Sequence, residues 1–251
     1  MILATRQTLS LTVRALLALW RQPWFVAITL VQPMIWLLLF GALFKKVVEI
    51  PGFHGGSYLH FLTPGVVVMS ALFAAGWNGM GLIEAIDRGI MDRFLVTPVW
   101  RGALVGASCI HAAVVILVQT VVIILVALAA GTSFSGTSIA MMLLLPLLLG
   151  GAIAALSNAV ALVTRQEESL IGIVQFVVLP ASFLSSGMMA SNLLPGWIHD
   201  IARFNPVNWT VTAVRSSDWS LIGAHAGYLA VLVLAAGWVA TRAFRVYQRA
   251  V

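Results

Sequence analysis

The segment Leu104–Ala130, LVGASCIHAAVVILVQTVVIILVALAA, contains no Asp, Glu, Lys or Arg. A helix needs about 20 apolar residues to cross a hydrocarbon core roughly 30 Å thick, and this segment exceeds that length. Its apolar residues run continuously, whereas the strands of a membrane barrel alternate between apolar and polar residues. The segment therefore predicts a transmembrane helix.

Other apolar segments of the chain share this character. The whole sequence is 61% hydrophobic and only 9% charged, whereas soluble domains average about 25% charged residues. We therefore expect an all-α integral membrane protein in which residues 1–251 form a single domain with six transmembrane helices. Besides Leu104–Ala130, the predicted spans are Phe25–Phe44, Phe61–Ile83, Ile139–Val163, Leu170–Gly187 and Leu221–Ala240.

The positions of the basic residues predict the orientation. If both termini are cytoplasmic, the outer segments hold only Lys45, Lys46, Arg203 and Arg215 of the 14 Lys and Arg residues. Basic residues concentrate on the cytoplasmic side of membrane proteins. We therefore expect a multi-pass protein of a bacterial-type inner membrane with cytoplasmic termini. No nucleic-acid partner is expected, because no basic domain lies outside the bilayer.

The segment before the first span, residues 5–22, is amphipathic. Leu9, Val13 and Leu16 recur at helical spacing, with arginines between them. This pattern predicts an interfacial helix in the inner headgroup layer. A tail that only carries orienting arginines is the alternative.

The segment Glu84–Pro98, EAIDRGIMDRFLVTP, is charged although it follows an apolar span. Apolar residues recur every fourth position through Phe94, and Glu84 and Arg88 are spaced as an i, i+4 ion pair on another face. The pattern predicts an ordered cytoplasmic helix with a docking surface, or a helix that lies on the membrane. The residues assigned to this element are Glu84, Asp87, Arg88, Gly89, Asp92, Arg93 and Phe94.

The segment between the fifth and sixth spans is too polar for a further span but carries many apolar residues. Pro195-Gly196 and Asn205-Pro206 punctuate it, and Trp197 follows the first pair. This punctuation predicts two short helices that form an outer re-entrant hairpin over residues 195–216. A loosely folded outer loop is the alternative.

The sequence offers little for an enzyme. A phosphate-binding loop of the G-x-x-x-x-G-K-[ST] type requires a Gly-Lys pair, and the chain has none. Ser185 and Ser186 with His111 are a possible nucleophile and base, but nothing in the sequence orients them. The histidines show no metal-ligand spacing. We expect a chain that is not an enzyme and holds no metal.

Four features resemble, in order, a type-2 permease of the ATP-binding-cassette (ABC) exporters. They are RQPWF followed by VQPMIWLLLFGALF, the charged motif from Glu84 to Pro98, SSGMM at the end of the fifth span, and NLLPGWIHDIARFNPVNWTVTAVR before the sixth. The group contains drug, nodulation-factor and polysaccharide or lipid exporters. Ala85 and Ile86 stand where members of the group are usually more acidic.

The resemblance implies a transport mechanism. The charged segment would be the coupling helix, which docks on a separate nucleotide-binding subunit that holds ATP and Mg. Two copies of the chain would pair around a central path for an amphipathic drug, lipid or lipid-linked glycan, and the hairpin would cap its outer end. A channel or scaffold protein without an ATPase is the alternative. The residues assigned to a second ATPase contact are Arg165, Glu167 and Glu168, and those assigned to the path are Trp77, Asn78, Gln175, Phe176 and Phe183.

Overall fold

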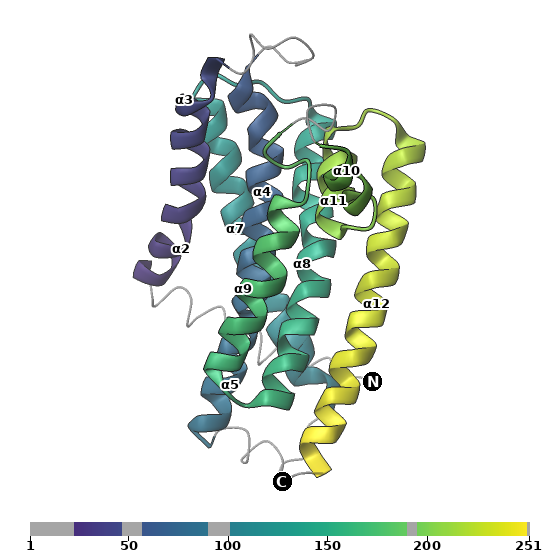
Figure 1. Cartoon of the computed structure of the whole chain (residues 1–251). Helices are drawn as coiled ribbons and strands as arrows, with labels where there is room; N and C mark the ends of the chain where they lie inside the picture. The colour runs from purple at the N-terminus through teal and green to yellow at the C-terminus, as the bar shows by residue number, and fades with distance from the viewer. Residues whose placement is uncertain (1–22, 47–56, 90–100, 190–194, 250–251) are drawn as a thin grey trace.

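The computed structural model describes residues 23–46, 57–89, 101–189 and 195–249, and these residues form helices and short connections with no strand among them (Figure 1). Two of the helices continue through irregular turns. Helix α2 (Pro23–Ile35) passes through a π-helical turn (Trp36–Phe40) into α3 (Gly41–Leu43), and α4 (Tyr58–Gly76) passes through a 3-10 turn (Trp77–Gly79) into α5 (Met80–Asp87). The other helices are α7 (Arg101–Ala129), α8 (Gly136–Thr164), α9 (Glu167–Phe183), α10 (Gly196–Ala202), α11 (Pro206–Arg215) and α12 (Trp219–Arg249).

Four of the described helices are long and apolar enough to cross a membrane: Tyr58–Asp87, Gly106–Ala129, Gly136–Thr164 and Trp219–Tyr247. The apolar helix Thr29–Leu43 is shorter, and α9 has 17 residues. The chain is therefore a multi-pass helical membrane protein, although only four of the six predicted spans reach membrane length here. The predicted interfacial helix over residues 5–22 lies outside the described residues.

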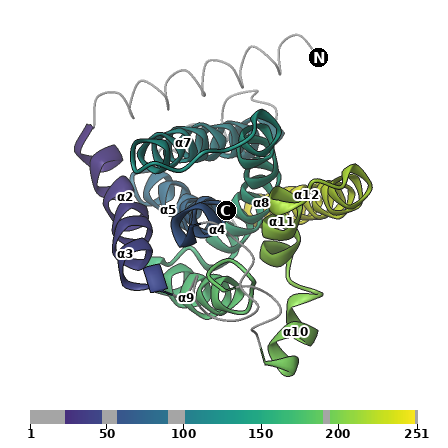
Figure 2. The ribbon, with the colours of Figure 1, turned by 90° about the horizontal axis from the view of Figure 1, so that it is seen from above.

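Helix α4 is the centre of the bundle. Every residue from Leu62 to Leu72 is buried, because α7, α8 and α9 surround it and the π-helical turn contacts it as well (Figure 2). Helix α12 packs mainly on α8, at the opposite side of the bundle from α2.

The two ends of the bundle differ. Helices α10 and α11 lie at one end, which we call the hairpin end, and α5 runs to the other, which we call the α5 end (Figure 1). The connection from α8 to α9 also lies at the α5 end. It is short because Arg165 ends α8 in the left-handed conformation, with φ 55°.

Helix α5 ends earlier than the sequence predicts. Its last residue is Asp87, and Gly89 adopts φ 64°, a conformation that glycine reaches without a steric penalty. A single helix over residues 84–98 is therefore wrong, because the helix stops before Gly89. Residues 90–100, which include Asp92, Arg93 and Phe94, lie outside the described part of the chain.

The predicted pair of short helices is present at the hairpin end. Pro195 precedes α10, and its carbonyl accepts bonds from the backbone of Ile198 and His199. Asn205 caps α11 by accepting a 3.0 Å hydrogen bond from the backbone amide of Val207. Pro206 occupies the first turn of α11, where a backbone N–H would have no partner within the helix, so its missing N–H costs no hydrogen bond.

Candidate functional site

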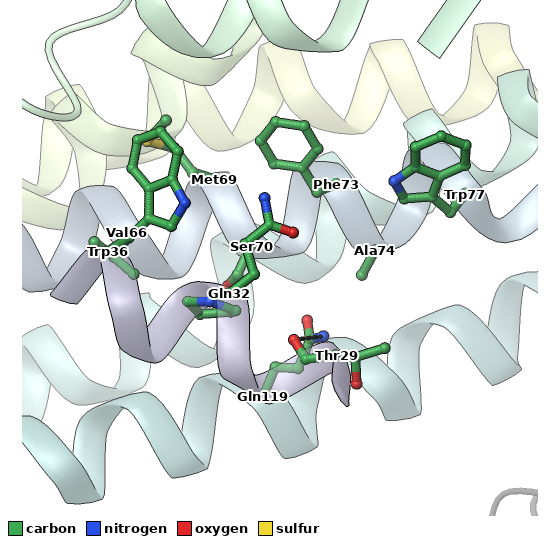
Figure 3. Close-up of a pocket in the computed structure, with 11 residues that line it drawn as sticks. Thr29, Gln32, Trp36, Val66, Met69, Ser70, Phe73, Ala74, Trp77 and Gln119 are labelled. Carbon is green, nitrogen blue, oxygen red and sulfur yellow. Dashed lines mark hydrogen bonds between the residues drawn. The ribbon is translucent and has the colours of Figure 1, made fainter. Parts of the chain in front are cut away.

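A pocket of about 550 Å³, which includes its open mouth, lies between the helix that begins with α2, the helix α4 and the helix α7. Its walls combine aromatic rings with a few amide and hydroxyl groups. Figure 3 shows Trp36, Phe73 and Trp77 along one side and Gln119 across from them. Thr29, Gln32 and Ser70 also line it.

Proline chemistry explains how Gln119 of α7 is held. Pro33 has no N–H, so the carbonyl of Thr29 one turn earlier cannot receive the usual helical bond from residue 33. The side-chain amide of Gln119 donates a long 3.4 Å bond to that carbonyl. Gln119 is 4% exposed, and its Oε1 atom has no hydrogen-bond partner among the described residues.

The residues predicted for the path do not come together. Trp77 lines the pocket, and Phe183 contacts Trp36, which lines it, with ring centroids 6.1 Å apart. Gln175 and Phe176 lie instead on the exposed face of α9, where Phe176 is 84% exposed. These two residues are therefore not part of the lining of this pocket.

Asn78, also predicted for the path, makes contacts between helices. Its amide donates to Ser108 of α7 at 2.7 Å and to Asn158 of α8 at 3.2 Å, so that one polar cluster joins three helices. The neighbouring Gly79 approaches Ser157 so closely that an added Cβ would lie 2.6 Å from the Ser157 carbonyl oxygen. The cluster therefore fixes the 3-10 turn between α4 and α5.

The α5 end carries exposed charge. Glu84 and Arg88 form the predicted i, i+4 ion pair, and both side chains are exposed. Asp87 is also exposed and has no ion-pair partner within the described ranges. Only Glu84, Asp87, Arg88 and Gly89 of the predicted coupling residues can be placed, and all four lie at this end.

The predicted second contact is divided. Arg165 stacks over the ring of Tyr247 in α12, 4.6 Å from its centroid, so its charge is used within the chain. Glu167 and Glu168 are exposed in the first turn of α9, where their negative charge interacts favourably with the helix dipole. The two glutamates are thus exposed, whereas Arg165 is half-buried.

The hairpin end is held by Arg215, the last residue of α11. Its guanidinium donates to the carbonyls of Ser186 at 2.6 Å, Gly187 at 2.8 Å and Phe61 at 2.9 Å, and it lies 3.8 Å from the centre of the Phe61 ring. Burial lowers the pKa of Arg215 to about 9, so the group stays protonated at neutral pH. One cation thereby ties α11 to α4 and to the segment that follows α9.

Two asparagines reinforce this connection. The Asn205 amide donates to the carbonyls of Ala181 and Leu184, at 2.7 and 2.8 Å, while Trp197 remains mostly exposed on α10. Asn208 accepts bonds from both the backbone amide and the hydroxyl of Ser186, at 3.0 and 2.7 Å. The sequence reasoning missed Arg215 and Asn208, whose only signal was a polar group on an apolar helix.

The serine residues considered as a nucleophile have structural contacts. The Ser185 hydroxyl donates to the carbonyl of Ser182 at 2.6 Å, and the Ser186 hydroxyl is bonded to Asn208. No hydrogen bond among the described residues joins either serine to His111. Within the same residues, no three His, Cys, Asp or Glu side chains gather into a metal-binding group.

Comparison with known proteins gives relatives along nearly the whole chain. The daunorubicin resistance ABC transporter permease protein DrrB1 of Streptomyces coeruleorubidus is 30% identical over 246 residues, covering 94% of this chain and 83% of that protein. The putative transport permease ycf38 of Porphyra purpurea is 27% identical over 217 residues, covering 84% and 75% of the two chains. The inner membrane transport permease YadH of Escherichia coli K12 is 26% identical over 195 residues, covering 74% of each.

A family model described as ABC-2 type transporter matches residues 6–219. The match takes in both ends of the bundle, from the exposed charges of α5 to the carbonyl contacts of Arg215. It confirms the resemblance that the sequence motifs indicated. The chain belongs to the ABC-2 type transporter family.

Proposed function

We propose that this membrane permease is the spanning subunit of an ATP-driven exporter, which moves an amphipathic drug, lipid or lipid-linked glycan outward by alternating access. Family membership supports a permease of an ABC transporter. The absence of a Gly-Lys pair fits a chain that leaves ATP and Mg to a separate nucleotide-binding subunit. That subunit would supply the energy for transport.

The α5 end is the proposed docking site for the ATPase, and the observation that carries the proposal is its continuity with the centre of the bundle. Exposed Glu84, Asp87 and Arg88 end a helix that begins at Tyr58 and includes the buried α4. A force on α5 therefore reaches the bundle core through one helix. Closure of the ATPase can then move the spans as a rigid body.

The orientation follows from this assignment. The α5 end faces the cytoplasm of a bacterial-type inner membrane, with both chain termini on that side, and the hairpin end faces outward. Adding the helix Pro23–Leu43 and α9 to the four membrane-length helices gives six spans. The first of these two is about 30 Å long at 1.5 Å per residue.

We further assign a second copy of the chain as a partner. Two helices expose large apolar side chains. These include Phe176 and Val177 on α9, and Ile35 and Leu38 on the helix Pro23–Leu43. In a homodimer these faces would border the central path. The hairpin, held by Arg215, would close the path at its outer end.

Purification from the native membrane tests the function. A tagged chain extracted in mild detergent is expected to bring with it, in near-equal amount, a soluble subunit with a phosphate-binding loop and vanadate-sensitive ATPase activity. Mass spectrometry identifies the subunit and a phosphate-release assay measures its activity. Recovery of the chain without any such subunit, under conditions that preserve other membrane complexes, would contradict an exporter and favour a channel or scaffold.

A further inference from the structure

The pocket between the helix Pro23–Leu43, α4 and α7 has the lining of a small-molecule binding site. Such sites are concave and mostly apolar with a few polar groups that fix the orientation of the ligand, and this pocket combines aromatic rings with a few amide and hydroxyl groups. None of its lining residues is Asp, Glu, Lys, Arg or His. A charged ligand would therefore find no counter-charge there, and a neutral one fits better.

Gln119 supplies a polar atom, Oε1, that no residue in the described part of the chain uses. Buried polar atoms are nearly always hydrogen-bonded, so a buried amide oxygen without a partner needs an explanation. Here the amide nitrogen is directed to the Thr29 carbonyl, which leaves Oε1 as an acceptor. Because Gln119 lines the pocket, a molecule inside it could donate the missing bond.

The aromatic wall faces this acceptor. Trp36, Phe73 and Trp77 stand along the opposite side of the pocket in Figure 3, and they come from two different helices. Flat aromatic side chains bury a large apolar area and favour stacked or edge-to-face contacts with another ring. The pocket therefore has an apolar side and, across from it, a single hydrogen-bond acceptor.

We propose that the pocket binds a neutral amphipathic molecule whose aromatic body lies against Trp36, Phe73 and Trp77, and whose N–H or O–H group donates a hydrogen bond to Oε1 of Gln119. As a substrate site, this proposal rests on the transport function proposed above. The site lies within one copy of the chain, so binding needs neither the ATPase nor a second copy. Its test is therefore independent of the outcome of the purification experiment.

Two isosteric probes separate the hydrogen bond from the apolar contact. N-phenyl-1-naphthylamine is neutral, aromatic and fluorescent, and it carries one N–H donor, whereas 1-benzylnaphthalene has a CH₂ group in its place. The full chain is reconstituted in lipid nanodiscs, and empty nanodiscs correct for the probe that enters lipid. Fluorescence titration gives the Kd of the first probe, and displacement of that probe gives the Kd of the second.

In the wild-type chain we expect the N–H probe to bind about five- to tenfold more tightly than the CH₂ probe, which is the effect of one buried hydrogen bond. Gln119→Leu should remove this difference and leave the Kd of the CH₂ probe unchanged. Gln166→Leu makes the same change at an exposed position outside the pocket and should preserve the difference.

A second variant guards against misfolding of Gln119→Leu. Trp36→Ala should weaken the binding of both probes equally, because it removes apolar contact without changing the acceptor on Gln119. The control Trp238→Ala, on an exposed part of α12, should leave the Kd of both probes unchanged. Equal wild-type affinities for the two probes would overturn the hydrogen bond to Gln119. The absence of saturable binding by either probe, or binding unaffected by both pocket variants, would overturn the site.

Discussion

The two ends of the bundle use polar groups in opposite ways. At the hairpin end, Arg215 and Asn208 direct their polar atoms to backbone groups of neighbouring segments. At the α5 end, Glu84 and Asp87 are exposed, and the ion pair present there joins residues of the same helical turn. The first end therefore uses polar groups to hold its own helices together, whereas the second leaves them accessible.

This difference distinguishes folding from function. Buried bonds from a cation to carbonyls stabilise a structure, because the carbonyls lose their partners if the cation is removed. Exposed ion pairs contribute little to stability. Charge at the α5 end therefore contributes little to the fold and is accessible to the partner proposed above, so substitutions at the two ends should have effects of different kinds.

The largest effect is expected from Arg215→Met. The change removes three hydrogen bonds to carbonyls and a ring contact, and we expect the free energy of unfolding to fall by about 3 kcal/mol. Titration with SDS in mixed micelles measures it. Arg203→Met, at an exposed arginine of the same hairpin, is the control and should change it by less than about 0.5 kcal/mol. Equal losses in both variants would contradict the role of Arg215.

The next largest effect is expected from Gly65→Ala in α4. An added Cβ would lie 2.0 Å from the carbonyl oxygen of Gly187, so α4 and the segment that follows α9 must move apart. We expect destabilisation by about 2 kcal/mol in the same titration. Gly151→Ala in α8, where a Cβ meets nothing within 4 Å, should be neutral or stabilising. A neutral Gly65→Ala would show that the hairpin end is not closely packed.

A smaller effect is expected from Asn208→Ala. The variant deprives the backbone amide and the hydroxyl of Ser186 of their shared acceptor, which should lower the free energy of unfolding by about 1–2 kcal/mol. Asn208→Asp keeps an acceptor and should recover part of the loss. If the aspartate variant is as unstable as the alanine variant, the hydrogen bonds of Asn208 are not what stabilises this end.

The smallest effect on folding is expected from exchanging the ion pair at the α5 end. Glu84→Arg with Arg88→Glu retains a pair but reverses the charges that a partner meets, so unfolding should change by less than about 0.5 kcal/mol. Recovery of the ATPase subunit in a pull-down should nevertheless fall at least tenfold. Asp200→Lys, on exposed α10, should leave recovery unchanged. Normal recovery of the ATPase subunit with the exchanged pair would show that these charges do not contribute to docking.

Local chemistry allowed several elements to be predicted from the sequence. The pairs Pro195-Gly196 and Asn205-Pro206 located both short helices, because a proline in the first turn and a capping asparagine determine where a helix begins. The ion pair of Glu84 and Arg88 followed from helical spacing alone. The end of α5 was missed, although Gly89 offered a signal for a break.

The arrangement of the site could not be predicted in this way. Asn78, Gln175 and Gln119 are all amides in apolar segments, yet their surroundings differ. Asn78 donates a hydrogen bond to Ser108, Gln175 is exposed, and Gln119 lines the pocket. A helix that is apolar on all sides gives no sequence signal for which face meets which neighbour. The role of Arg215 likewise depends on carbonyls far away in the sequence, one of them on Phe61.

The most direct test of the central claim is to find which end touches the ATPase subunit. Asp87→Cys and Asp200→Cys, each made with Cys109→Ser to remove the chain's one cysteine, carry a benzophenone cross-linker at the α5 end and the hairpin end. In the purified complex, irradiation should cross-link the ATPase subunit to position 87 and leave position 200 unlinked. Cross-linking at position 200, or none at position 87 in an intact complex, would contradict the assignment of the α5 end as the docking site.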